Sequence, residues 1–153
     1  MTDGFILWSM SRFNGQNFAI CGKTIESLRR NVITLMPQWL EGIFSITERR
    51  SENKLIITSG GVTNSYYMFG GKDESSYTLV QGITLAGVLF DEVALMPRSF
   101  VEQAMARCSV AGSKFWFNCI PENARHWFDV ESVSYSHLRA HETRSYLVCR
   151  LLR

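Results

Sequence analysis

The stretch GITLAGVLFDEVALMPRSF, residues 82–100, joins a continuous apolar run to two adjacent carboxylates. Residues 85–90 are apolar without alternation, a pattern typical of a central parallel strand covered on both faces. Asp91 and Glu92 follow directly, although burying an unpaired carboxylate is strongly unfavourable. The sequence therefore predicts a strand that ends at Phe90, where solvent or a ligand stabilises the charges.

Residues before this run follow strand and helix patterns in turn. Residues 18–21 form a short apolar strand. Over 25–39 the apolar residues recur at helical spacing, which predicts one amphipathic helix with Thr24 as its N-cap. The stripe consists of Ile25, Leu28, Val32, Leu35 and Trp39. Two further strand patterns, 54–58 and 63–69, flank the residues Ser-Gly-Gly-Val and predict a β-hairpin.

A second helix and a final strand follow the carboxylates. Pro97 suits the first turn of a helix, because its fixed φ matches and it has no N–H to leave unpaired. The buried face of that helix is expected at Val101, Ala104, Met105 and Cys108. Residues 114–121 read as another strand, with the polar Asn118 near its end. This order of elements predicts an α/β sheet with crossover helices.

Composition limits the classes of protein that fit this chain. Its 153 residues suit one domain with a real core, and 46% hydrophobic residues is typical of a soluble globular protein. No apolar run approaches the ~20 residues of a membrane span. The four cysteines form no CxxC pair, which indicates reduced thiols in a cytoplasmic chain. Residues 1–132 hold 12 basic and 13 acidic side chains, so charge gives no indication of nucleic-acid binding.

Two carboxylates at the tip of a parallel strand suit a phosphate–magnesium site, because ligands of open α/β sheets bind beyond the carboxyl ends of strands. One carboxylate would hold Mg²⁺, through water since Mg²⁺ dehydrates reluctantly. The other would orient the attacking water for phosphoryl transfer. This is the pattern of a Walker B strand followed by a catalytic glutamate. On this stretch alone, a solvated acidic turn explains the charges at least as well.

The sequence of residues 81–128, QGITLAGVLFDEVALMPRSFVEQAMARCSVAGSKFWFNCIPENARHWF, resembles the ATPase domain of bacteriophage terminase large subunits. Upstream, FAICGKT followed by SLRRNVI, and then YYMFGGKDESS, resemble the same family. The resemblance covers residues 4–131, with several motifs in the family's order. It implies a P-loop NTPase-type three-layer α/β sandwich, with a mostly parallel sheet, that binds ATP and Mg²⁺.

The resemblance implies roles for four residues. Asp91 corresponds to the Walker B carboxylate, which binds Mg-ATP by holding Mg²⁺ through water. Glu92 corresponds to the catalytic glutamate, and Asn118 to the polar residue that senses the γ-phosphate. Ile120 departs from the family's Asn-Cys-Asn-Pro pattern, which weakens any polar role there. Arg107 is a candidate transition-state arginine, although an arginine that caps its helix is the more common explanation.

The phosphate-binding loop of the family is missing from this sequence. Such a loop reads GxxxxGK[ST], and its backbone amides bind the phosphates. Residues 22–24, Gly-Lys-Thr, match only its end, and Asn17 stands where the first glycine is required. The resemblance places the loop ahead of Met1, opening the helix that residues 2–10 continue. Residues 1–131 are therefore interpreted as a partial ATPase domain without its phosphate-loop strand and without the nuclease domain that follows it in the family.

The end of the chain resembles the translation of a transposase-based sequencing-library adapter. Residues 133–143 match that translation with one change, Ser136 in place of threonine. Residues 147–152 match the block that follows the adapter's variable index. Residues 132–153 are therefore interpreted as an adapter-derived tail that is not native. Two histidines four residues apart lie in this tail, so we expect no metal site from them.

Two other patterns have both a structural and a binding explanation. Residues 70–72, Gly-Gly-Lys, suit a turn after the hairpin or an anion-binding nest, and we favour the turn. The aromatic pairs at 116–117 and 127–128 suit a core or base stacking. We favour the core, because no basic groove accompanies them.

The resemblance predicts part of a viral DNA-packaging motor in the host cytoplasm. In the family, ATP hydrolysis drives double-stranded phage DNA into the capsid. The motor is a homo-oligomeric ring on the portal protein and works with a small terminase subunit. This chain alone is expected to hydrolyse little or no ATP, since the loop makes most phosphate contacts. The alternatives are another P-loop NTPase of helicase-like type and a non-catalytic truncated subunit that binds a motor through a sheet edge.

Overall fold

A computed structural model describes residues 1–34, 36–72, 74–119 and 146–151. The described strands form one seven-stranded sheet in the order β2-β3-β4-β1-β5-β6-β7. They are β1 (Asn17–Gly22), β2 (Ser45–Arg49), β3 (Lys54–Ser59), β4 (Val62–Gly70), β5 (Gly87–Phe90), β6 (Lys114–Cys119) and β7 (Tyr146–Leu151). From β4 to β7 every neighbouring pair is parallel, whereas β3 is antiparallel to both β2 and β4.

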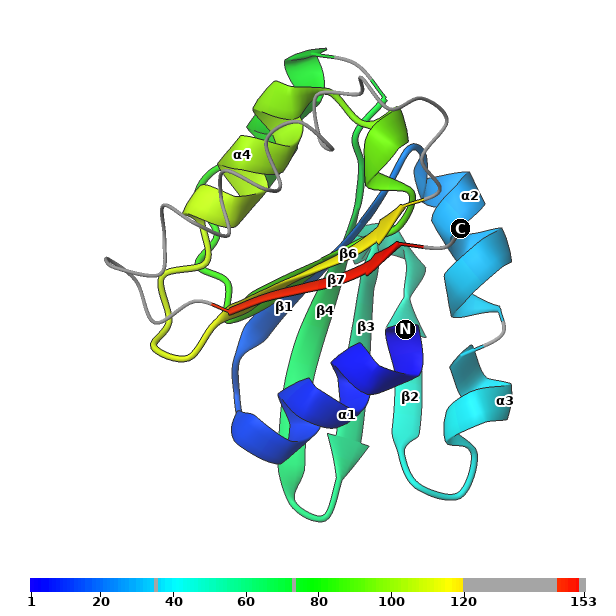
Figure 1. The fold of residues 1–153 in the computed structure, drawn as a ribbon. Helices are drawn as coiled ribbons and strands as arrows, with labels where there is room; N and C mark the ends of the chain where they lie inside the picture. The colour runs from blue at the N-terminus through cyan, green and yellow to red at the C-terminus, as the bar shows by residue number, and fades with distance from the viewer. Residues whose placement is uncertain (35, 73, 120–145, 152–153) are drawn as a thin grey trace.

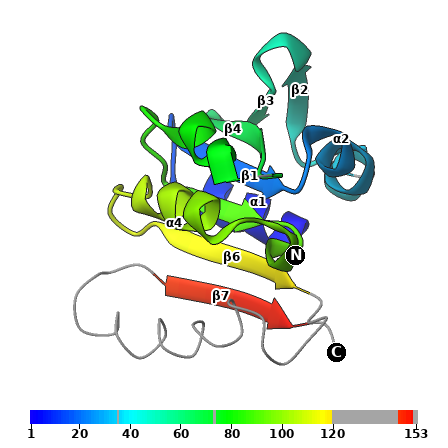
Figure 2. The same cartoon turned by 90° about the horizontal axis from the view of Figure 1, so that it is seen from above.

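Helices cover both faces of the sheet (Figure 1 and Figure 2). One face carries α1 (Thr2–Arg12), α2 (Ile25–Leu28), the π-helical turn η1 (Arg29–Ile33) and α3 (Met36–Leu40). The other carries α4 (Arg98–Ala106) and the 3-10 turns η3 (Glu74–Val80) and η4 (Val93–Leu95). The predicted three-layer α/β sandwich with a mostly parallel sheet is confirmed. Within the described residues, no helix has the length and apolarity needed to cross a membrane.

The apolar run within residues 85–90, from which a central parallel strand was predicted, contains β5, near the centre of the sheet. The four residues of β5 are buried between β1 and β6, both of which run parallel to it. Leu89 belongs to the core under α1, and Val88 and Phe90 belong to the core under α4. Phe90 stacks on Phe117 of β6, with ring centroids 5.1 Å apart. The prediction of a parallel strand covered on both faces is therefore confirmed.

The single helix predicted over 25–39 is wrong in its middle, where η1 interrupts it. Pro37 lies in the first turn of α3, and its ring would clash with the carbonyl of Ile33 in a continuous α-helix. A π turn contains more residues than an α turn, so it rotates the buried face. Between Leu28 and the end of α3, the buried residues are Val32, Ile33, Met36 and Leu40. Of the predicted stripe, Leu35 and the side chain of Trp39 lie outside the described residues.

The predicted hairpin is confirmed, and an additional strand extends it. β3 and β4 pair antiparallel, and Gly60 and Gly61 turn the chain with φ values of 57° and 82°. β2 pairs antiparallel with β3 and forms one edge of the sheet. β2 was not predicted, because Ile46 is its only apolar residue and leaves no alternating pattern in the sequence.

β7 pairs in parallel with β6 and lies in the segment interpreted as adapter-derived. Strand pairing uses backbone groups that every residue except proline carries in full. The position of β7 therefore does not distinguish a native segment from an adapter-encoded one. The division of the chain at residue 132 stays a prediction.

Candidate functional site

Asp91 and Asn118 meet at the carboxyl edge of neighbouring parallel strands. β5 ends one residue before Asp91, and its register pairs Phe90 with Phe117 of β6. The next residue on each strand therefore lies beside the other. The Asn118 side-chain Nδ2 donates a hydrogen bond to Asp91 Oδ1 at 2.9 Å. The structure thus brings together two of the predicted site residues, which are 27 positions apart in the sequence.

The Asp91 carboxylate has no cationic partner in the described part of the chain. Its side chain is half-buried, and no described ion pair includes Asp91 or Glu92. The Asp91 backbone N–H donates to the Cys21 carbonyl at 2.8 Å, which ties this turn to the end of β1. A half-buried carboxylate at a strand tip, with one oxygen oriented by an amide, can bind a cation from outside the protein.

Glu92 turns the chain immediately after Asp91. Its backbone lies in the left-handed region, with φ 56° and ψ 55°, and its side chain caps no N–H of η4. Successive residues of a strand face opposite ways, so this turn is what frees Asp91 and Glu92 to act at one site. A non-glycine residue in this conformation is strained by about 1–2 kcal/mol. Strain of this kind is concentrated at functional sites.

Glu92→Gly is expected to raise the free energy of unfolding of the chain by about 0.5–1 kcal/mol, because glycine adopts this conformation without steric cost. Urea denaturation followed by tryptophan fluorescence measures the change. Glu102→Gly is the control, since Glu102 lies inside α4, and it should destabilise by about 1 kcal/mol. A loss of stability in Glu92→Gly would show that the Glu92 side chain stabilises the fold.

Arg107 lies at the opposite edge of the sheet from the carboxylates. Its carbonyl accepts a hydrogen bond at 2.8 Å from Leu85, ahead of the start of β5, whereas Asp91 follows the end of β5. At ~3.3 Å per strand residue, roughly 20 Å separates the two ends. The Arg107 guanidinium faces Gln103. With the Gln103 amide oxygen turned toward it, Arg107 Nε and Nη2 donate to that oxygen at 3.2 and 2.8 Å. The position of Arg107 thus does not support a transition-state role at Asp91 of the same chain. Arg107 lies at the C-cap of α4, which fits the helix-capping alternative.

Large terminases of known structure match both this fold and this sequence. The large terminase of a thermophilic bacteriophage, called here the thermophilic-phage terminase, matches with a TM-score of 0.86 and 51% identity, over 97% of this chain and 36% of that chain. The same terminase in complex with ATP-gamma-S matches with a TM-score of 0.83 and 47% identity, over 97% and 35%. The chain belongs to the large terminase family.

This terminase chain spans 36% of the length of the thermophilic-phage terminase. The Thermus phage P74-26 large terminase ATPase domain matches with a TM-score of 0.52 and 14% identity, over 80% of this chain and 54% of that domain. A likeness at this identity shows the fold alone, and the fold is that of a terminase ATPase domain. No protein-family model and no curated protein sequence matches the chain.

The loop after β1 has a structural role in the terminase chain. Thr24 Oγ1 accepts from the Ser27 backbone N–H at 3.1 Å, and Ser27 Oγ accepts from the Thr24 N–H at 3.3 Å. These two bonds form a capping box at the start of α2, so the predicted N-cap is confirmed. Lys23 is exposed beside it.

The glycines at 70–71 allow close packing. A Cβ on Gly71 would lie 2.4 Å from the Phe100 ring, and the Gly71 N–H already donates to the Gly22 carbonyl at 2.8 Å. Neither Gly70 nor Gly71 has a positive φ. A nest needs free N–H groups and a left-handed residue, so the anion-binding alternative receives no support. The favoured turn is corrected as well, since close approach to α4 explains Gly71.

The predicted aromatic core is confirmed for its described members. Phe117 is buried under α4, whereas Trp116 packs on the opposite face against Phe5 and Trp8 of α1. The remaining candidates lie outside the described residues: Ile120, Trp127, Phe128, His137 and His141.

The donor set at the strand tip fits Mg²⁺. Among the described residues, no group of three or more His, Cys, Asp or Glu side chains gathers in one place. Mg²⁺ is commonly held by one or two carboxylates, with phosphates and waters completing its shell, so a larger protein cage is not required. Asp91 would hold the ion and Glu92 would lie next to it. The thermophilic-phage terminase has been solved with ADP and with ATP-gamma-S.

Proposed function

We propose that this chain forms part of the ATPase of a phage DNA-packaging motor and supplies its Walker B carboxylate and catalytic glutamate. The observation that carries the proposal is the 2.9 Å hydrogen bond from Asn118 to Asp91, at the edge where parallel sheets bind ligands. Membership of the large terminase family supports ATP as the nucleotide.

Each residue has a separate role in this proposal. Asp91 holds Mg²⁺ through water, and the ion neutralises the charge that develops on the phosphates. Glu92 accepts a hydrogen bond from the attacking water and orients it. Asn118 donates to Oδ1 of Asp91, which leaves the other carboxylate oxygen of Asp91 for the hydrated ion. Nδ2 of Asn118 has a second N–H, which can donate to a phosphate oxygen.

The direction of α1 supports a phosphate site at the same edge. A Cβ on Gly4 would lie 3.5 Å from Trp116, whereas Trp8 approaches Gly87, at the start of β5. α1 therefore points its N-terminus toward the carboxyl ends of β5 and β6 (Figure 1). The positive end of the helix dipole favours phosphate at that edge.

The handedness of the crossovers supports a phosphate loop ahead of Met1. α4 connects β5 to β6 on one face, and α1 lies on the other. A right-handed connection through α1 into β1 must then come from the β6 side of the sheet. β5 and β6 fill the nearest positions, so a strand that leads into α1 would lie where β7 lies here. Its carboxyl end would reach the edge next to Asn118.

The partners of the motor belong to the same proposal. Double-stranded phage DNA, the portal protein and the small terminase subunit would be its partners, in a homo-oligomeric ring in the host cytoplasm. The alternatives are a helicase-like P-loop NTPase and a non-catalytic subunit. The first has no support from the comparisons, whereas the second stays an alternative, because the isolated chain has no GxxxxGK[ST] loop.

A chimera tests the proposal. Residues 1–119 of this chain replace only the residues that match them in the thermophilic-phage terminase, and the remaining sequence of that terminase supplies every other element. We expect the chimera to hydrolyse ATP in a Mg²⁺-dependent reaction, within about tenfold of the parent, because all proposed catalytic groups are kept. A chimera that binds ATP-gamma-S and folds, yet does not hydrolyse ATP, would contradict the proposal and favour the non-catalytic alternative.

The chain by itself is expected to show no ATP hydrolysis above that of its own Glu92→Gln variant. Positioning of the phosphates contributes a large part of phosphoryl-transfer catalysis, and the chain contains no phosphate loop. A phosphate-release assay with the purified chain makes the comparison. Glu92-dependent hydrolysis would show that the strand tip positions a nucleotide without the loop.

A further inference from the structure

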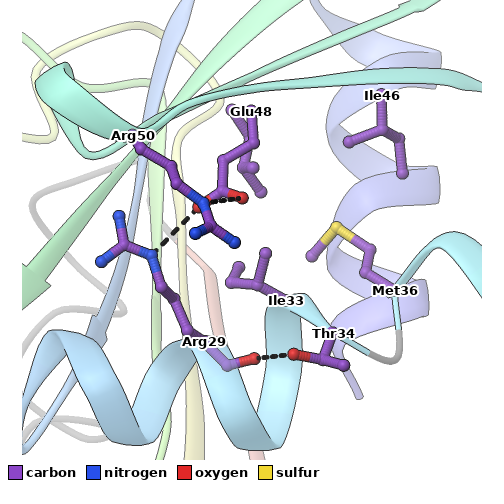
Figure 3. Close-up of a pocket in the computed structure, with 8 residues that line it drawn as sticks. Arg29, Ile33, Thr34, Met36, Ile46, Glu48 and Arg50 are labelled. Carbon is purple, nitrogen blue, oxygen red and sulfur yellow. Dashed lines mark hydrogen bonds and ion pairs between the residues drawn. The ribbon is translucent and has the colours of Figure 1, made fainter.

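We propose that the pocket between η1, α3 and β2 binds an extended acidic peptide that pairs with the free edge of β2. The pocket has a volume of about 300 Å³ (Figure 3). In the strand order, β3, β4 and β1 separate β2 from β5. At ~4.8 Å per strand, the pocket lies about 19 Å from the strand that carries Asp91. It is therefore a separate site, independent of the proposed ATPase function.

The floor of the pocket is apolar. Ile33 of η1 and Met36 of α3 are 8% and 1% exposed, and Ile46 of β2 is half-buried beside them (Figure 3). The π turn has one more residue than an α turn. Ile33 therefore faces the same side as Val32 and lies on this floor. A space of this size is at the small end of ligand pockets and suits one aliphatic side chain with part of a neighbour.

The rim of the pocket is charged and has an excess of donors. Glu48 accepts from Arg29 Nε at 3.0 Å through one oxygen and from Arg50 Nε at 3.3 Å through the other. Partial burial raises the pKa of Glu48, but the bonds from both arginines outweigh it and hold that pKa below its usual value. Two guanidinium groups around one carboxylate leave a net positive charge and several unused N–H donors. A carboxylate is the complementary ligand.

Arg50 can reach a ligand without disturbing the fold. Its side chain is 81% exposed, and its bond to Glu48 uses only Nε. Arg29 is more firmly held, since its Nη2 also donates to Asn53 Oδ1 at 3.0 Å. Arg50 is therefore the group expected to bind the incoming carboxylate, with Arg29 fixing Glu48 behind it.

The free edge of β2 suits a peptide in the extended conformation. Among the described residues β2 pairs only with β3, so one row of its backbone N–H and C=O groups is unpaired. Ile46, Glu48 and Arg50 alternate along the chain and line the same pocket. A strand added to this edge would place every second side chain over the pocket, in the mode of β-strand addition. An aliphatic side chain would then pack on Ile46, and a carboxylate four residues along would lie opposite Arg50.

Nucleic acid fits this site less well. Phosphate would also bind two arginines, but strong binding needs many basic groups along a groove. Residues 1–132 carry 12 basic and 13 acidic side chains, and Glu48 already pairs with both Arg29 and Arg50. An acidic peptide needs only one charged contact, with backbone pairing supplying the rest.

The test measures fluorescence anisotropy of a short labelled peptide with the full chain. The peptide alternates threonine with aliphatic residues and carries one glutamate four positions from a central leucine. We expect saturable binding and an increase in Kd of about tenfold for Arg50→Ala. Arg30→Ala is the matched control, since Arg30 is exposed on η1 and does not line the pocket, and its Kd should stay within about twofold. Glu48→Gln should lower the Kd, because it removes a competing carboxylate.

Two altered peptides and one duplex separate the alternatives. A peptide with lysine in place of glutamate and a peptide with N-methylated backbone amides should both lose binding, since one removes the charge and the other the pairing. No saturable binding, equal effects of Arg50→Ala and Arg30→Ala, or unchanged affinity of the N-methylated peptide would overturn the proposal. If a DNA duplex bound in an Arg50-dependent way and more tightly than the peptide, the pocket would be assigned to phosphate instead. Circular dichroism of each variant confirms that it is folded.

Discussion

Glu92→Gln is expected to lower the kcat of ATP hydrolysis by about 100-fold or more in the chimera that carries residues 1–119 of this chain within the thermophilic-phage terminase. Glutamine keeps the size of Glu92 but removes the negative charge that, in the proposed function, orients and polarises the attacking water. Nucleotide binding should change little, because Asp91 and the phosphate loop supplied by the parent terminase remain. A coupled ATPase assay gives kcat, and titration with ATP-gamma-S gives affinity.

Glu102→Gln is the matched control for this experiment. Glu102 lies on α4 and pairs with Arg98 at 2.7 Å, on a partly exposed helix surface. The same chemical change there should leave kcat within about twofold, because exposed ion pairs contribute little. Retention of most activity in Glu92→Gln would remove Glu92 from the catalytic role and leave its strained turn without a catalytic explanation.

Phe90→Ala is expected to lower the free energy of unfolding of the chain by about 3–5 kcal/mol. Phe90 is fully buried, ends β5, and stacks on Phe117, so its removal leaves a cavity directly behind Asp91. Domains are typically stable by about 5–15 kcal/mol, so this loss is a large part of the total. Urea denaturation followed by circular dichroism measures it.

Phe90→Leu separates packing from the specific ring contact. Leucine keeps most of the apolar volume, so we expect a loss below about 1.5 kcal/mol. A small effect of Phe90→Ala would mean that β5 is not packed between two helical layers. In the chimera, Phe90→Ala should also reduce ATP hydrolysis, because the position of Asp91 depends on this strand.

Local patterns predicted the elements whose environment is uniform along their length. The run 85–90 is covered on both faces, and the hairpin around Gly60 and Gly61 has its own turn chemistry. The pattern over 25–39 failed where Pro37 and the π turn change the helical period. β2 was missed because an edge strand buries too little to leave a pattern.

The position of Arg107 was open to prediction from topology. A crossover helix returns the chain from the carboxyl edge of one strand to the amino edge of the next, so the end of α4 must lie far from Asp91. The resemblance made Arg107 a candidate for the site at Asp91, whereas the direction of the helix places Arg107 at the opposite edge of the sheet. The same rule places Asn118 correctly, because it follows a full parallel strand.

The sequence by itself determined that an apolar parallel strand ends in two carboxylates and that the chain resembles the terminase ATPases. Tertiary structure alone decided three further points: the bond from Asn118 to Asp91, the approach of Gly71 to Phe100, and the pocket that joins Arg29 to Glu48 and Arg50. The reason is physical. Burial and propensity act on each residue and its near neighbours, so they leave a periodic pattern in the sequence. Contacts between distant residues depend on the order and handedness of packed strands, which no local pattern records.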